Sequence, residues 1–282
     1  TEVKSIIIQD GAVLSVDENI TLTIQDNIQV LGSGQFIVNN NASILQNNAS
    51  AVNVGNITYS RDAMPMRQFE FTYWGSPVAG QVLNVFSPLT LSDKFYSYNA
   101  NVGVNNWVIE NQNNVMTPGK GYAIRAPQGY TSTPQVFSGQ FVGTPNNGNV
   151  SANVVAFNPM LLNYNLLANP YPSAINVVTL IDNSNLGTLY FWTHNSAIAS
   201  NVFTSDDYAI RTRTTGTAAV TGGTAPGIYV AAGQAFFASA GTTTTINFTN
   251  AMRVAGNNSQ FYRSAQDLPL NYYFHLNMTN TL

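Results

Sequence analysis

Residues 69–79 read FEFTYWGSPVA and residues 164–174 read YNLLANPYPSA, and these two stretches reveal an internal repeat. Each is an apolar run followed by a proline-containing turn, and the two stand 95 residues apart. Two more blocks recur in the same order: FYSY at 95–98 matches LYFW at 189–192, and PGKGYAI at 118–124 matches AGQAFFA at 232–238. Three matched blocks in one order predict an internal repeat, in which a unit of strand, proline turn, aromatic strand and glycine-led strand occurs twice.

Each copy ends in a further alternation, so each half is expected to hold four or more strands. The two halves together are expected to form a β-sandwich or two packed β subdomains. Helices are nearly absent from the pattern. The exceptions are two short helices, expected at Val82–Phe86 and Ile175–Asp182, which follow the two proline turns.

The N-terminal region, residues 5–48, has a period of two broken by Gly, Asp and Asn turns. Strands this short, recurring about every eight residues, favour a parallel solenoid of two or three rungs; an antiparallel sandwich is the alternative. The expected strands are Ile6–Ile8, Ala12–Val16, Ile20–Ile24, Ile28–Val30, Phe36–Val38 and Ile44–Leu45.

We therefore expect an all-β chain with a short N-terminal parallel β-solenoid-like coil, followed by a β-sandwich region built from two pseudo-repeats. The expected division is a coil at 1–60, a first half-repeat at 61–150, a second at 151–265, and the start of a following β segment at 266–282. Residues 272–279 alternate like an opening strand, so we read the chain as a piece of a longer protein.

Composition excludes several classes of function. The 282 residues carry a net charge of −3 with only 8 % charged side chains, so no basic face attracts nucleic acid or anionic lipid. The absence of cysteine excludes thiolate catalysis and cysteine-zinc clusters. No apolar run reaches the roughly 18 residues of a membrane span, so membrane insertion is not expected. The amide- and hydroxyl-rich, lysine-poor composition favours an extracellular location.

Catalytic patterns are also missing. The two histidines, His194 and His275, belong to different segments, and no metalloprotease, nucleophile-elbow or P-loop motif occurs. Paired acids could cleave a glycosidic bond, and Asp206–Asp207 could bind calcium, but isolated acids are more often solvated turn residues. The acids in question are Glu70, Glu110, Asp206 and Asp207. We expect no enzyme activity and no catalytic, cofactor-binding or metal-binding residue.

The three tryptophans divide by position. Trp74 and Trp192 lie in the repeated blocks, where an apolar strand residue is expected to serve the core of each half. Trp107 lies in the Asn-rich stretch 99–114 and is the one expected to be exposed, where it could form part of a sugar-stacking strip. Lys120 and Arg125 flank a strand and are expected to lie over its edge.

The repeated blocks carry a resemblance. YWGSPVAGQ at 73–81, FYSYN at 95–99, PGKGYAIRAP at 118–127 and LLANPYPSAI at 166–175 come in order, and FTNAMRVAGNNSQFYR follows at 248–263. This series resembles the surface and secreted proteins of Bacteroidota, flavobacteria above all, that leave the cell through the type IX secretion system. The resemblance implies export across the outer membrane and surface display, with a C-terminal sorting domain further along. It transfers no catalytic residue.

Three functions follow as expectations. The first is a non-enzymatic structural or adhesive module of a secreted surface protein, with other copies of itself, other surface proteins or surface glycans as partners, and with self-assembly into fibres or a surface layer. The alternative is a carbohydrate-binding module of a secreted polysaccharide-acting protein, which predicts that Trp107 and nearby tyrosines form an exposed aromatic strip. A third, glycoside hydrolase activity, predicts two acids facing each other across a cleft.

Overall fold

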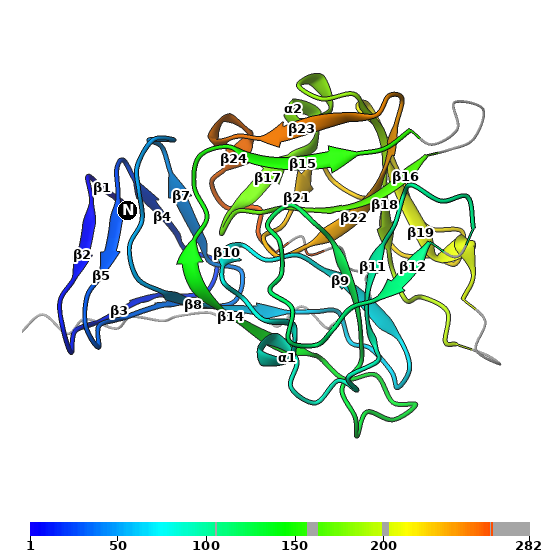
Figure 1. Ribbon diagram of the computed structural model, residues 1–282, viewed down its shortest axis with the longest axis horizontal. Helices are drawn as coiled ribbons and strands as arrows, with labels where there is room; N and C mark the ends of the chain where they lie inside the picture. Colours follow the sequence, from blue (N-terminus) through cyan, green and yellow to red (C-terminus); the bar gives the residue numbers. More distant parts are fainter. Residues whose placement is uncertain (105, 157–162, 199–202, 260, 262–282) are drawn as a thin grey trace, which may run out of the picture.

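The computed structural model describes residues 1–104, 106–156, 163–198, 203–259 and 261, and these residues are mostly β structure with two short α-helices (Figure 1). The all-β prediction is thereby confirmed. The helices α1 (Leu83–Phe86) and α2 (Val177–Asp182) lie within the two segments predicted to be helical. Asn176 caps α2 by accepting hydrogen bonds from two backbone N–H groups of its first turn.

The N-terminal segment (β1–β7) consists of short parallel strands at one end of the molecule (Figure 1). Paired residues across its sheets are 21 or 22 positions apart, as in Ile6 with Ile28 and Val13 with Gln35. The parallel sets are β1-β4-β7, β2-β5 and β3-β6-β8. The strands are β1 (Glu2–Val3), β2 (Ile6–Ile8), β3 (Val13–Val16), β4 (Thr21–Ile24), β5 (Ile28–Val30), β6 (Gln35–Val38), β7 (Ser43–Gln46) and β8 (Ile57–Asp62).

Alternation and turn chemistry explain these strands. In β2 and β5 the first and third residues are buried while the middle one points outward. Asn41 (φ 61°) and Gly32 (φ 54°) take the left-handed backbone conformation in turns. Side-chain amides connect neighbouring strands: Asn47 donates to the Gln25 side-chain oxygen at 2.9 Å. The abundant asparagine therefore supplies turns and inter-strand hydrogen bonds.

The first half (β8–β14) begins with β8, which pairs in parallel with β6 on one side and antiparallel with β14 on the other. Its second sheet has the strand order β12-β11-β13-β9. The new strands are β9 (Phe71–Trp74), β10 (Val78–Ala79), β11 (Phe95–Tyr98), β12 (Trp107–Ile109), β13 (Tyr122–Arg125) and β14 (Ser138–Pro145).

The second half (β15–β24) has a sheet of order β16-β22-β18-β19-β20, together with the pair β15-β23 and the set β21-β17-β24. Its strands are β15 (Val150–Val154), β16 (Tyr164–Ala168), β17 (Ala174–Asn176), β18 (Leu186–Trp192), β19 (Tyr208–Arg211), β20 (Gly216–Thr217), β21 (Tyr229–Val230), β22 (Ala235–Ala240), β23 (Thr244–Phe248) and β24 (Arg253–Val254).

The two halves share one strand order. The first-half sheet β12-β11-β13-β9 matches β19-β18-β22-β16 of the second half, position by position. Reciprocal hydrogen bonds fix the register, because Gly75 N donates to Gly233 O and Ala168 N donates to Gly119 O. Gly75 and Ala168 are therefore counterparts, so the offset here is 93 residues, and Pro77 corresponds to Pro170 instead of Pro172.

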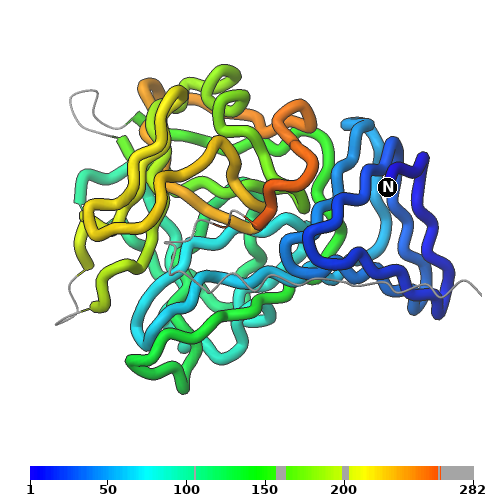
Figure 2. Tube along the Cα trace, turned by 180° about the vertical axis from the view of Figure 1, so that it is seen from behind, coloured from blue at the N-terminus to red at the C-terminus, as the bar shows by residue number. Residues whose placement is uncertain are grey.

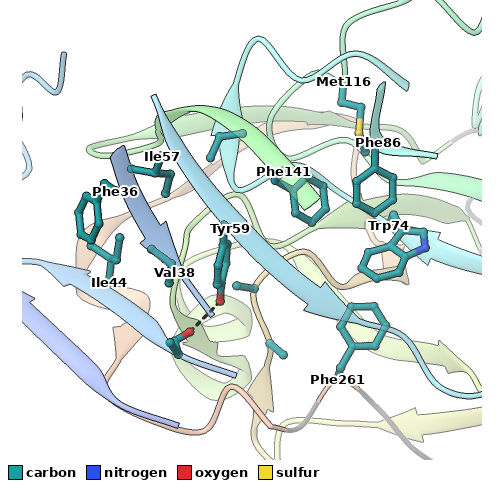
Figure 3. Packing of buried hydrophobic residues seen from close by; sticks show 14 of the residues in the cluster. Phe36, Val38, Ile44, Ile57, Tyr59, Trp74, Phe86, Met116, Phe141 and Phe261 are labelled. Atoms are coloured by element: carbon teal, nitrogen blue, oxygen red, sulfur yellow. Dashed lines mark hydrogen bonds between the residues drawn. The ribbon is translucent and has the colours of Figure 1, made fainter. Parts of the chain in front are cut away.

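Three groups of buried apolar side chains hold the layers together. The largest runs from the N-terminal segment into the first half, where Trp74 contacts the rings of Phe86, Phe141 and Phe261 (Figure 3). In the same group the Tyr59 hydroxyl donates to the Ala42 carbonyl at 2.8 Å (Figure 3). A second group fills the second half, and a third joins β9 and β13 to β16 and β22.

The N-terminal segment and the second half lie beside each other in both views (Figures 1 and 2). Arg253 connects them. Its buried guanidinium donates to the Ile44 carbonyl at 2.7 Å, the Ser173 hydroxyl at 3.0 Å and the Asn147 side chain at 3.1 Å. It also lies over the ring of Tyr171 at 4.9 Å. Burial lowers the pKa of Arg253 to about 10, which leaves it charged at neutral pH.

Candidate functional site: an aromatic cleft between the halves

The sheets β12-β11-β13-β9 and β16-β22-β18-β19 face each other, and a cleft of about 440 Å³ opens between them. We call this the aromatic cleft. It lies within the size range of small-ligand sites. Seven of its ten lining residues are aromatic: they are Phe71, Tyr73, Tyr96, Trp107, Ala123, Trp192, Phe203, Thr204, Ser205 and Tyr208.

The cleft exists because one of two equivalent positions carries a small side chain. Tyr96 pairs with Ala123 in the first half, and its counterpart Tyr190 pairs with Phe237 in the second, so Ala123 and Phe237 are counterparts. The Phe237 ring is only 6 % exposed and fills its side of the junction. Its centroid lies 4.8 to 6.2 Å from five other rings, which are those of Tyr73, Tyr98, Trp107, Tyr164 and Tyr208. Alanine at 123 leaves the equivalent volume open.

The rings of the cleft form a continuous surface across both halves. Tyr73 stacks on Trp192 at 6.2 Å with an interplanar angle of 27°, and it also lies beside the rings of Trp107 at 5.9 Å and Tyr208 at 6.4 Å. Trp107 is 42 % exposed, as the sequence predicts. Aromatic side chains from both halves therefore line the cleft.

Polar groups sit among the rings. The hydroxyls of Tyr73 and Tyr208 share a hydrogen bond of 2.6 Å across the junction. Burial raises the pKa of both phenols, so both stay neutral at physiological pH. Thr204 and Ser205 add hydroxyls, and the described lining carries no charged side chain.

Trp192 is held in place by a buried histidine. Its indole N–H donates to Nδ1 of His194 at 2.9 Å. Because Nδ1 accepts, the proton of the neutral imidazole lies on Nε2, which donates to the Thr72 hydroxyl at 3.2 Å. Burial, with a smaller effect of Arg67, lowers the pKa of His194 to about 3. His194 thus orients Trp192 and ties the second half to β9 of the first.

Trp74 is buried in the core of the first half at 1 % exposure, as predicted, whereas Trp192 is partly buried and packs against the group between the halves instead of the core of the second half. The reason is the alternation of β18. Leu189 and Phe191 point into the core of the second half, so Tyr190 and Trp192 point toward the other sheet.

Two of the four acids considered as catalytic or calcium-binding candidates share a cavity. Glu70 and Asp207 are both buried and line a smaller cavity of about 220 Å³ beside the aromatic cleft. Glu70 pairs with Arg67 at 3.1 Å. Asp207 accepts hydrogen bonds from Ser196 N at 3.1 Å and from the Thr221 hydroxyl at 2.5 Å. Both carboxylates are thus engaged in holding loops.

The remaining named residues lie elsewhere. Glu110 pairs with Lys120 at 2.7 Å, and Asp206 is exposed. Lys120 lies over the Tyr122 ring and Arg125 over the Phe69 ring. His275 and the alternation at 272–279 lie outside the described residues. Among the residues that the structure describes, no group of three or more His, Asp and Glu side chains is placed to hold a metal ion.

No helix in the described part of the chain is long and apolar enough to cross a membrane. Comparison with known proteins gives one match: a family described as a domain of unknown function (DUF8693) covers residues 1–281. No curated protein and no solved structure matches the chain.

Proposed function

The chain belongs to the DUF8693 family, and we propose that it is a non-enzymatic extracellular module that binds a sugar ring in the aromatic cleft. The observation that carries the proposal is the open volume at Ala123, which is lined by tyrosine and tryptophan from both halves. Attachment to glycans would give a surface protein its adhesive role, so this proposal joins the two functions expected from the sequence.

The chemistry of the lining supports a sugar. One face of a pyranose presents C–H groups, which pack favourably on the electron-rich face of an aromatic ring. Its hydroxyls need donors and acceptors, and Tyr208, Thr204 and Ser205 offer both. An apolar wall with a few placed polar groups is the usual composition of a small-molecule site.

Three architectural and cellular features complete the proposal. We propose that the parallel pairings at 21- and 22-residue spacing form a short solenoid-like coil. We also propose that the two pseudo-repeats form a β-sandwich region, and that the protein is displayed at the cell surface after type IX export. Low charge and the resemblance of the repeated blocks support surface display.

A titration followed by tryptophan fluorescence tests sugar binding, with neutral gluco-, manno- and galacto-oligosaccharides as probes. We expect a saturable change because Trp107 and Trp192 both line the cleft. Trp107→Ala should weaken binding about tenfold or more, equal to about 1.4 kcal/mol. Ala123→Phe should abolish it by filling the cleft as Phe237 fills the counterpart position.

The control for Ala123→Phe is Ala49→Phe, which adds the same side chain at an exposed turn in the N-terminal segment. This control should bind as the wild type does. Unchanged binding by a folded Ala123→Phe variant would contradict the proposal, as would the absence of a saturable response to every probe.

A further inference from the structure

We propose that the aromatic cleft selects uncharged saccharides over uronate-containing ones; this inference rests on the proposed function and names its ligand class. The described lining contains aromatic rings, hydroxyls and one alanine. A sugar carboxylate entering this volume would lose its hydration and meet no cation among the lining residues. Burying an unpaired charge is strongly unfavourable.

Asp207 places a carboxylate in the neighbouring cavity, which shares part of its lining with the aromatic cleft. Its carboxylate is 1 % exposed, and the cavity it lines shares Trp192, Phe203 and Thr204 with the aromatic cleft. Its hydrogen-bond donors, Ser196 N and the Thr221 hydroxyl, are neutral groups, so they stabilise the charge without cancelling it.

Glu70 lines the same cavity, but it is accompanied by a cation. Its carboxylate accepts hydrogen bonds from both the backbone N–H and the guanidinium of Arg67. Arg67 thereby pairs with Glu70, whereas Asp207 has no cationic hydrogen-bond partner among the described residues. Like charges in a poorly hydrated site repel each other more strongly than in water, so a ligand carboxylate is disfavoured twice.

The test compares sugars that differ only at C6. β-1,4-Linked gluco-, manno- and galacto-hexaoses and their 6-carboxyl counterparts are titrated into the full chain at low ionic strength, with tryptophan fluorescence as the readout. We expect the best neutral hexaose to bind at least tenfold more tightly than its 6-carboxyl counterpart. Raising the salt concentration should lower this ratio of neutral to carboxylated affinity, because salt screens charge repulsion.

Asp207→Asn removes the charge and keeps an acceptor oxygen for the Thr221 hydroxyl. In this variant the ratio of neutral to carboxylated affinity should fall several-fold toward one. Thr221→Val, which removes one donor to Asp207 and retains its charge, is the matched variant and should keep the preference for neutral sugars.

The outcomes separate the two proposals. Equal binding of neutral and carboxylated hexaoses, or tighter binding of the carboxylated ones, overturns the charge selectivity and leaves sugar binding standing. Binding of neither series overturns the proposed function and this inference with it.

Discussion

At the scale of single residues, His194 shows how burial fixes a protonation state. Its neutral ring accepts from Trp192 and donates to Thr72, so protonating Nδ1 would break the bond that orients Trp192. The pKa of about 3 lies well below the ordinary value of 6.5. A histidine whose pKa is lowered by folding stabilises the folded state fully above pH 6.5, and this contribution is lost as the pH falls from 6.5 toward 3.

We therefore expect acid to destabilise the wild type more than a His194→Gln variant, whose side chain does not titrate. Between pH 7.5 and 4.5 the wild type should lose on the order of 2 kcal/mol more unfolding free energy than the variant. Urea denaturation at the two pH values measures this difference. The carboxylates are the same in both proteins, so identical losses would show that His194 is not held neutral.

At the scale of the elements, the two facing sheets approach closely where glycine is present. An added Cβ at Gly121 would lie 2.7 Å from Leu166 Cγ and 3.0 Å from the Cβ of Ala235, its counterpart in the second half. The main-chain hydrogen bond from Gly121 N to Leu166 O, at 3.0 Å, depends on the same approach.

Gly121→Ala should accordingly destabilise the protein by about 1–3 kcal/mol through overpacking. Gly241→Ala is the control, because a Cβ there meets nothing within 4 Å and its backbone requires no positive φ. Thermal unfolding of both variants measures the effect. A Gly121→Ala protein as stable as Gly241→Ala would show that the sheets have room to separate.

Much of this element-level arrangement could be predicted from the sequence. Period-two runs and Gly or Asn turns located six of the seven N-terminal strands, β2 to β7, to within about one residue and missed β1, and both short helices were found. The direction in which Trp192 points could not be predicted. Both faces of the sheet that contains β18 are apolar, and alternation alone does not say which face packs into the core of the second half. The cleft depends on Ala123 being the first-half counterpart of Phe237. This correspondence can be established only when the register between the two halves is known.

At the scale of the whole molecule, strands β1, β2 and β3 each lie at the edge of a sheet and together form one end of the described structure. Edge strands present unpaired backbone groups that favour strand addition. Ile7, in the middle of β2, is 55 % exposed and points outward between the buried Ile6 and Ile8.

We expect the chain to self-associate through this end at high concentration, and Ile7→Lys to shift it toward the monomer, since an outward lysine blunts an edge strand. Sedimentation velocity over a range of concentrations measures both. Val220→Lys is the control, because Val220 is 84 % exposed and lies in the second half. A wild type that stays monomeric throughout contradicts this expectation.

The unequal pair Ala123 and Phe237 has a consequence for how such a chain can diversify. A duplicated motif places two equivalent positions at the junction between the halves. One bulky side chain, that of Phe237, is enough to fill its side of this junction. Valine or leucine in place of Ala123 would reduce the open volume in steps, while Phe237 continues to fill its own side of the junction. The volume of the cleft can thereby be changed by substitutions at one residue.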